Sequence, residues 1–279
     1  MQSVNLIYSS TVDSKYDCFQ KCSSLKNGCL LVSIKVNQCN LYNRLDYSSF
    51  ITNVDTILFT KSVDDYSSIT PYLTNHWTFN NNFIDLITGL SLANGSNAAT
   101  FTRDRLNSPS SALRINNGYI QAPNDFYFNG DFTVSFWIKI YTMIGGNVRI
   151  FSFLDKNSGG GNINAVEIIL IGNIYPALHI VNSVGTITWY QSSLALNVGT
   201  KWQHVAVTLK GNTFVIYVDG KNVRQGSITA PIKAYRTLCY FGRSFWGGDP
   251  PFNGELDDMK IFNRSLSSDD IFKVMNDFY

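Results

Sequence analysis

The chain has 279 residues, a formal net charge of +2, 44% hydrophobic residues and 14% aromatic residues. This composition excludes intrinsic disorder, which goes with few aromatic residues and a high net charge. Only 15% of the residues are charged and no block of Lys and Arg stands out, so no nucleic-acid partner is expected. Asn, Ser, Thr and Tyr are abundant while helix formers are scarce, which favours a β-rich protein.

Four of the five cysteines lie close together near the start of the chain: Cys18, Cys22, Cys29 and Cys39. Their spacing lacks the C-x2-C pairs and the nearby histidine of a zinc site, so disulfides in an oxidising compartment are expected. Three connectivities are open from the sequence alone. Cys239 stands apart and is interpreted as a small buried hydrophobic residue.

Residues 1–62 are predicted to form a small module around these cysteines. A capping-box-like start at residues 14–17 predicts a helix that places two of the cysteines on one face. Strand-like segments follow at Leu30–Val36, Gln38–Tyr42 and Thr56–Lys61. Because so short a region has only a marginal core, disulfides would contribute much of its stability.

The segments Asp17–Cys22, Gly28–Cys29 and Cys39–Tyr42 resemble the PAN/apple family. The resemblance implies a small disulfide-stapled α+β module with the nested pairs Cys18–Cys39 and Cys22–Cys29. It also implies a non-catalytic module that binds proteins or carbohydrates.

Residues 63–75 contain Pro71 and no periodic pattern, which is typical of a linker, and residues 76–279 are long enough for one large β-domain. Its strand patterns follow one another without intervening helices and are separated by turns such as Asp219-Gly220. This organisation predicts an antiparallel sandwich or jelly roll. The expected strands are Phe132–Ile140, Val166–Ile171, Ala177–Val181, His204–Leu209, Thr213–Val218, Lys221–Arg224 and Leu256–Phe262.

The end of the chain predicts a short amphipathic helix. Ser267 and Asp270 have the spacing of a capping box, with Asp in the final position. Apolar residues then recur at helical spacing from Ile271 to Phe278, so this helix is expected to close the domain.

Several segments of the second region, in order along the chain, resemble the concanavalin A-like, laminin G-like domains. The resemblance implies an antiparallel β-sandwich of the jelly-roll type, so the chain as a whole is expected to be mainly β. The segments are His76–Phe79 with Asp85 nearby, Ala112–Arg114, Phe132–Trp137, Trp202–Thr208, Tyr217–Gly220 and Phe252–Ser267.

The same jelly roll also hosts glycoside hydrolases, which need a pair of carboxyl groups at the scissile bond. One hydrolase branch carries them on one strand as E-x-D-x-x-E, whereas this chain has Glu255-x-Asp257-x-x-Lys260. Glu167, the other of the two Glu residues, stands alone in an apolar strand pattern. No G-x-S-x-G motif is present, and His76, His179 and His204 have no evident catalytic partner. No catalytic residue is therefore expected.

A calcium ion is the metal that the sequence best allows, because Ca²⁺ prefers carboxylate and carbonyl oxygens. Asp85 and Asp257 lie in segments that the family resemblance places near neighbouring first and last strands. The alternative is that Asp257 and Asp258 only accept hydrogen bonds or face solvent.

Carbohydrate binding is predicted from aromatic side chains in two loop-like stretches. Phe245, Trp246 and Asp249 lie in a glycine-containing stretch, and Trp189 and Tyr190 lie in a second one. Aromatic faces beside Asp or Asn suit a sugar, although packing inside the domain is the alternative for each tryptophan. Two N-x-[ST] sequons, at Asn94 and Asn263, are expected on surface loops and predict glycosylation.

These patterns together predict a non-catalytic extracellular recognition or adhesion protein that binds glycan or protein ligands through jelly-roll loops. A structural or protein-interaction fragment of a larger surface protein and a jelly-roll hydrolase are the alternatives. Residues 1–3 lack the character of a signal peptide, so a mature or trimmed piece is expected. No membrane insertion is expected, because the best apolar run, Ile163 to Ile171, falls far short of the roughly 20 residues of a span.

Overall fold

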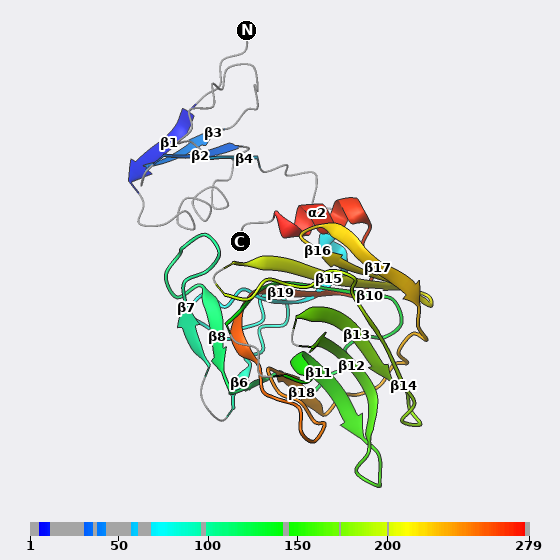
Figure 1. Ribbon diagram of the computed structural model, residues 1–279. Coiled ribbons are helices and arrows are strands. Elements are labelled where there is room, and N and C mark those ends of the chain that lie inside the picture. Colours follow the sequence, from blue (N-terminus) through cyan, green and yellow to red (C-terminus); the bar gives the residue numbers. More distant parts are fainter. Residues whose placement is uncertain are drawn as a thin grey trace. The chain divides into compact units, whose positions relative to one another are not determined.

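The computed structural model describes residues 68–276 except 96–98, 142–144, 173 and 200, together with the backbone of four strands nearer the N-terminus (Figure 1). The chain divides into two compact units. One contains residues 1–71, 103–109 and 276–279, and the other contains residues 72–102 and 110–275.

The first unit contains an antiparallel sheet of four strands in the order β1-β3-β2-β4. The strands predicted near residues 30–36, 38–42 and 56–61 are confirmed, whereas β1 was not predicted. The predicted helix and the predicted disulfides among Cys18, Cys22, Cys29 and Cys39 lie outside the described residues and stay predictions. The strands are β1 (Leu6–Thr11), β2 (Leu31–Lys35), β3 (Gln38–Tyr42) and β4 (Ile57–Thr60).

The second unit is a sandwich of two antiparallel sheets, so the predicted jelly roll is confirmed (Figure 1). The first sheet, called the β10 sheet, contains β5 (Leu73–Trp77), β7 (Thr100–Thr102), β8 (Ala112–Asn116), β10 (Phe132–Ile140), β15 (Gln203–Lys210), β16 (Thr213–Val218), β17 (Lys221–Ser227) and β19 (Asn253–Phe262). Its order is β17-β16-β15-β10-β19-β8-β7, and β5 also pairs with β19.

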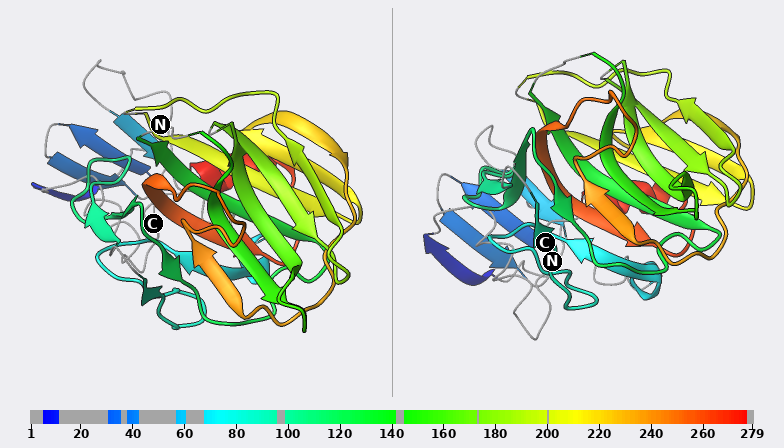
Figure 2. Two further views of the ribbon diagram at one scale, coloured as in Figure 1. Left: turned by 60° about the horizontal axis from the view of Figure 1, so that its bottom comes forward. Right: turned by 90° about the horizontal axis from the view of Figure 1, so that it is seen from below.

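The second sheet, called the β12 sheet, has the order β14-β13-β12-β11-β18-β9-β6. In Figure 2 its green central strands lie beside the orange β18. Its strands are β6 (Ala93–Asn94), β9 (Ile120–Gln121), β11 (Val148–Lys156), β12 (Asn162–Ile171), β13 (Tyr175–Val181), β14 (Ile187–Gln191) and β18 (Leu238–Phe241).

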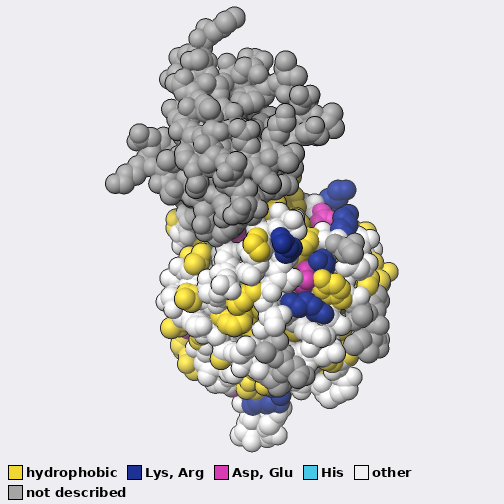
Figure 3. All heavy atoms as spheres, turned by 90° about the vertical axis from the view of Figure 1, so that its left-hand side faces the viewer, with side chains coloured by type: hydrophobic (Ala, Val, Ile, Leu, Met, Phe, Trp, Pro, Cys, Tyr) yellow, Lys and Arg dark blue, Asp and Glu magenta, His cyan; other side chains and the backbone are white. Residues whose placement is uncertain are grey.

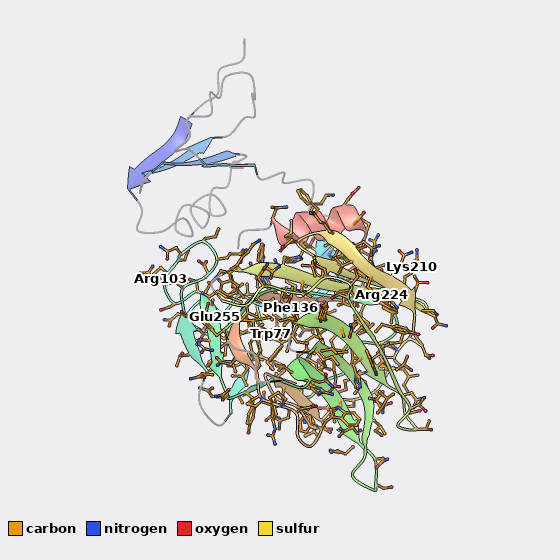
Figure 4. All side chains as sticks on the ribbon, in the orientation of Figure 1. Trp77, Arg103, Phe136, Lys210, Arg224 and Glu255 are labelled. Carbon is orange, nitrogen blue, oxygen red and sulfur yellow. The ribbon has the colours of Figure 1, made fainter. Side chains whose placement is uncertain are left out.

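The core lies between the two sheets and takes alternate residues from their strands. On β12, Val166, Ile168 and Leu170 belong to the core, while the residues between them face outward. Figure 4 places Trp77 and Phe136 inside this layer, where both are buried. The core fixes the register of each strand, because a slip of one residue would turn its apolar side chains outward.

Local sequence signals determine several boundaries. β10 and β16 have the predicted bounds. Asp219 and Gly220 both have positive φ values, 48° and 74°, as a tight hairpin turn requires. The last helix, α2 (Ser268–Met275), begins at the predicted capping box, in which the Asp270 amide donates to Ser267 Oγ at 3.2 Å and the Ser267 amide to Asp270 Oδ2 at 3.3 Å.

Two features differ from the sequence-based predictions. β5 begins at Leu73, inside the stretch predicted as a linker. Residues 189–191 were predicted as a loop but form part of the edge strand β14. Their Ile-Thr-Trp-Tyr-Gln context is β-favouring, and pairing with β13 decides their conformation. The 3-10 helix η2 (Thr70–Tyr72) precedes β5.

One face of the second unit is mostly uncharged (Figure 3). On the face seen in Figure 3, the described surface consists mostly of uncharged side chains, backbone and scattered apolar groups. The sequon residues Asn94 and Asn263 are both exposed; Asn263 follows β19 outside any strand as predicted, whereas Asn94 lies in the short strand β6 rather than in a loop. No helix in the described part of the chain combines the length and the apolar character that a membrane crossing would require.

Candidate functional site

A row of polar and aromatic residues crosses the outer face of the β12 sheet. In the strand register, Ser152 of β11 lies opposite Glu167 of β12, Glu167 lies opposite His179 of β13, and His179 lies opposite Trp189 of β14. Directly opposed residues of neighbouring strands point to the same side of a sheet. Four consecutive strands, β11 to β14, therefore place these side chains in one line.

Glu167 is the centre of this row and is fully buried. Its Oε2 atom lies 2.7 Å from His179 Nδ1 and 3.6 Å from Arg149 Nε, and it accepts a hydrogen bond from Trp246 Nε1 at 3.3 Å. Its Oε1 atom accepts a hydrogen bond from the hydroxyl of Ser152. A buried carboxylate needs such partners because its desolvation is costly.

These partners keep Glu167 charged. Burial by itself would raise the pKa of the Glu167 carboxyl. The hydrogen bond with His179, the charge of Arg149 and the hydroxyl of Ser152 outweigh the burial and hold this pKa below its ordinary value. The outer face of the sheet thus contains a fixed negative charge at neutral pH.

The connection between β18 and β19, residues 242–252, covers part of this face and contributes Trp246 and Asp249. The rings of His179 and Trp246 meet edge to face, with 5.8 Å between their centroids. Asp249 forms an ion pair with Arg149 and accepts a hydrogen bond from Ser244 Oγ at 2.8 Å. Because Arg149 is buried and contacts both carboxylates, it links this connection to the strands beneath it.

A pocket of about 300 Å³ opens where these groups meet, and we call it the tryptophan pocket. This volume is at the small end of the range for small-molecule sites. The pocket combines indole faces and aliphatic side chains with amide, imidazole, guanidinium and carboxylate groups. It is lined by Asn147, Arg149, Ile169, Ile171, His179, Ile187, Trp189, Trp246 and Asp249.

The structure brings together three of the five predicted sugar-binding residues. Trp189, Trp246 and Asp249 all line the tryptophan pocket. Tyr190 does not, because alternation along β14 turns it to the opposite face, where it stacks on Phe214 with 5.0 Å between ring centroids. Phe245 also does not line the pocket, and its ring packs against Tyr240.

Sequence reasoning missed Asn147, Arg149, His179 and the role of Glu167. Glu167 was interpreted as solitary, yet it contacts residues from β11, β13 and the β18–β19 connection. A polar residue within an apolar strand was the one signal in the sequence. Its partners could not be found without the strand register.

Glu255, the second Glu, is also engaged by neighbouring side chains. Glu255 is buried, and its Oε2 atom lies 2.7 Å from Lys139 Nζ. Its Oε1 atom accepts a hydrogen bond from the Tyr141 hydroxyl at 2.6 Å. Lys260, which stands where the hydrolase motif has its last Glu, is buried on the same strand.

The predicted metal ligands lie in different settings. Asp85 accepts four hydrogen bonds, from the Asn75 amide group at 2.7 Å, the Thr88 hydroxyl at 2.8 Å, and the backbone N–H groups of His76 at 2.8 Å and Ile87 at 3.0 Å. Its carboxylate therefore organises a turn. Asp257 is buried on β19 opposite Trp137. Among the described residues no group of three or more His, Cys, Asp or Glu is arranged to hold a metal ion, and calcium stays a prediction.

The remaining histidines and Cys239 have structural settings. His204 Nε2 lies 2.8 Å from Ser135 Oγ, and its ring meets the ring of Trp137. His76 Nε2 lies 3.2 Å from Asp258 Oδ1. Cys239 is fully buried in the core, which confirms its interpretation as a small hydrophobic residue.

Solved structures with the same fold include glycan-binding proteins. One is domain 4 of AbnA, a GH43 extracellular arabinanase from Geobacillus stearothermophilus, in complex with arabinotriose, with 19% identity, a TM-score of 0.58, and coverage of 73% of this chain and 98% of that one. A second is the ligand-binding domain of botulinum neurotoxin serotype D in complex with N-acetylneuraminic acid, with 18% identity, a TM-score of 0.57, and coverage of 76% and 52%.

A third is the binding domain of Paraclostridial Mosquitocidal Protein 1, with 19% identity, a TM-score of 0.56, and coverage of 74% and 52%. This chain thus spans about half the length of the two toxin domains. At such identities the likeness shows a shared fold. A comparison with curated proteins finds no match.

The family of the chain follows from its sequence together with this fold. Residues 114–272, which include every residue that lines the tryptophan pocket, match the Laminin_G_3 family, described as the concanavalin A-like lectin/glucanases superfamily, and the chain therefore belongs to this family.

Proposed function

We propose that the jelly roll is a non-catalytic glycan-binding domain of an extracellular protein, and that the tryptophan pocket binds one neutral sugar unit. The observation that carries this proposal is the meeting of Trp189 and Trp246 with Asn147 and Asp249 around one small pocket. Apolar ring faces suit the C–H face of a sugar, and a few placed polar groups suit its hydroxyls.

The charges of the pocket favour a neutral sugar unit over an acidic one. Arg149 lines the pocket, but it already contacts Glu167 and Asp249. The carboxylate of an acidic sugar would be repelled by these two acidic residues, which already share the one cation. Neutral hydroxyls can instead hydrogen bond to the exposed polar atoms without disturbing this balance.

The states of the carboxyl groups support binding over hydrolysis. A glycosidase needs one carboxyl group that can donate a proton and a second one at the scissile bond. Glu167 is fully buried beneath the pocket and engaged by four side chains. Asp249 is paired with Arg149. Neither group has the freedom that proton transfer to a glycosidic oxygen requires.

Two observations support an extracellular setting. The sequon residues Asn94 and Asn263 are exposed, so both are accessible for glycosylation. The cysteine cluster of the first unit favours an oxidising compartment. Domain 4 of the extracellular arabinanase is described in complex with arabinotriose and the botulinum neurotoxin domain in complex with N-acetylneuraminic acid, and this precedent agrees with the proposal.

The test is a glycan array with the full chain, followed by calorimetry on any glycan that binds. Trp189→Ala is the decisive variant, because Trp189 is 48% exposed and its loss leaves the core intact. Removal of a tryptophan contact at the centre of a site typically costs about 2 kcal/mol or more, so affinity should fall by about 30-fold.

Trp202→Ala is the matched control. Trp202 is also partly exposed, but it lies next to β15 of the other sheet, where its ring contacts Lys139. This variant should bind like the unmodified chain. A blank array, or a glycan whose affinity is the same for Trp189→Ala, would refute the assignment of the pocket.

A further inference from the structure

A second hollow adjoins the tryptophan pocket. It has a volume of about 350 Å³, and Asp249 lines both cavities. Tyr119, Arg243 and Ser244 also line this second hollow. The shared residue places the two cavities within reach of one oligosaccharide.

Arg243 is held in this hollow by three aromatic rings. Its guanidinium carbon lies 4.6 Å from the ring centroid of Tyr119, 5.2 Å from that of Tyr240 and 5.4 Å from that of Phe245. The rings also hold one another, since the Tyr119–Tyr240 and Tyr240–Phe245 pairs meet edge to face. Cation–π contacts of this kind fix a guanidinium in place without using its N–H donors.

The donors of Arg243 have no acceptor in the described part of the chain. The hydrogen bonds and ion pairs found among the described residues include none from its guanidinium. The other arginines near this surface differ in this respect. Arg149 is paired with Asp249, and Arg114 donates to Asn253 Oδ1 at 2.7 Å and to a backbone carbonyl.

The charged residues that line the hollow are Arg243 and Asp249. Lys156 Nζ lies 5.9 Å from the ring centroid of Phe245, so a second cation approaches the same aromatic group. The nearest carboxylate lining the hollow, Asp249, is engaged by Arg149 and by the Ser244 hydroxyl. A planar guanidinium with free N–H groups suits an anion with two parallel oxygens.

We propose that Arg243 binds an anionic group, a carboxylate or a sulfate, on the sugar unit next to the one in the tryptophan pocket. The ligand class is therefore an acidic glycan with a neutral unit beside a charged unit. This inference rests on the proposed function and deepens it. Phe245, which sequence reasoning assigned to the sugar site, then acts by positioning Arg243.

The experiment compares matched neutral, carboxylated and sulfated glycans on one array with the full chain, followed by calorimetry on the best set. Hydrogen bonds to charged groups contribute about 1.5–3 kcal/mol, so the acidic members should bind about 10- to 100-fold more tightly than the neutral member. Arg243→Gln should remove this difference and leave the affinity for the neutral glycan unchanged. Arg243→Lys keeps the charge but not the planar fork and should give an intermediate affinity.

Arg224→Gln is the matched control. Arg224, labelled in Figure 4, extends from β17 with its guanidinium carbon 5.9 Å from the ring centroid of Tyr190, so it is also an arginine on a tyrosine ring. This variant should retain the preference for acidic glycans. The anion is identified by whichever set of glycans, carboxylated or sulfated, binds more tightly than the neutral set.

The outcomes separate the two proposals. Equal affinity for neutral and acidic glycans, with no effect of Arg243→Gln, overturns the inference while a loss of binding in Trp189→Ala still supports the proposed function. If no glycan of any charge binds, both fail. A preference for acidic glycans that survives Arg243→Gln also overturns the assignment to Arg243.

Discussion

Glu167→Gln removes the charge at the centre of the outer-face network while keeping the size of the side chain. Glu167 is fully buried and accepts contacts from Ser152, His179 and Trp246. A flipped amide preserves each contact as a neutral hydrogen bond, because the Ser152 hydroxyl can turn and accept. Charge-assisted hydrogen bonds contribute about 1.5–3 kcal/mol and neutral ones about 0.5–1.5 kcal/mol, so each contact weakens by about 1 kcal/mol.

The free energy of unfolding should therefore fall by about 3 kcal/mol at neutral pH. This is the lower end of the range of about 3–5 kcal/mol for breaking a buried ion pair. The lower end applies because Arg149 keeps its second partner, Asp249. Urea denaturation followed by tryptophan fluorescence measures this loss in the jelly roll specifically, since all five tryptophans lie within residues 77–246.

The difference should depend on pH with a definite sign. The pKa of Glu167 is lower in the folded chain than its ordinary value of 4.5. The stability from its charged form is thus present above that value and is lost as the pH falls through the folded pKa. The deficit of Glu167→Gln should shrink in acid. Asp269→Asn, at the exposed start of α2, should cost only about 0.5 kcal/mol at either pH.

Two results would refute this reasoning. One is a Glu167→Gln variant that loses less than about 0.5 kcal/mol at neutral pH, the level of ordinary surface substitutions. The other is a loss of the same size at neutral pH and in acid, which would mean that the charge of Glu167 does not contribute.

Three further predictions concern the second unit. Arg236→Met should lower the free energy of unfolding by about 2–4 kcal/mol, because Arg236 is fully buried and its loss leaves the carbonyl groups of Tyr127 and Asn164 without their donor. Calorimetric unfolding measures this loss, with the exposed Arg264→Met as the control variant. Equal melting temperatures of the two variants would contradict the prediction. Cys239 should resist thiol reagents in the folded chain and react after denaturation, because burial raises its pKa to about 12. Peptide mass spectrometry locates the labelled cysteine. Rapid labelling of Cys239 in the native chain would count against its buried position. Asp85→Asn should lower the free energy of unfolding by about 1–3 kcal/mol, because the hydrogen bonds from the backbone amides of His76 and Ile87 become weaker. Thermal unfolding should show the same loss with added calcium and with a chelator. A loss seen only with added calcium would establish Asp85 as a metal ligand.

Local patterns were sufficient wherever one segment carries its own signal. The alternation of β10 and β16, the Asp219-Gly220 turn and the capping box of α2 each act within a few residues, and each has the predicted structure. The pairing of short strands such as β6 and β9 had no such signal, because a strand of two residues is too short to show a hydrophobic alternation.

The candidate site shows the same division. Trp246 and Asp249 were recognisable because glycines and an aromatic ring in one stretch predict an exposed loop, and Trp189 was found although its segment is a strand. Tyr190 was predicted together with Trp189, but the alternation of β14 turns its side chain away from the tryptophan pocket. Its ring stacks on Phe214 and packs against the core, which the sequence alone did not reveal.

The sequence by itself determined the fold class, the absence of a hydrolase carboxylate pair on the last strand, and three of the residues of the tryptophan pocket. Only the tertiary structure decided that Glu167, His179 and Arg149 form one network beneath that pocket, and that Arg243 is held by three rings with its donors unused. The physical reason is that hydrogen bonds and ion pairs act over a few ångströms, while their partners here lie as many as 100 residues apart, as Arg149 and Asp249 do. The register of the β12-sheet strands and the path of the β18–β19 connection bring them together, and no single segment of the sequence predicts either one.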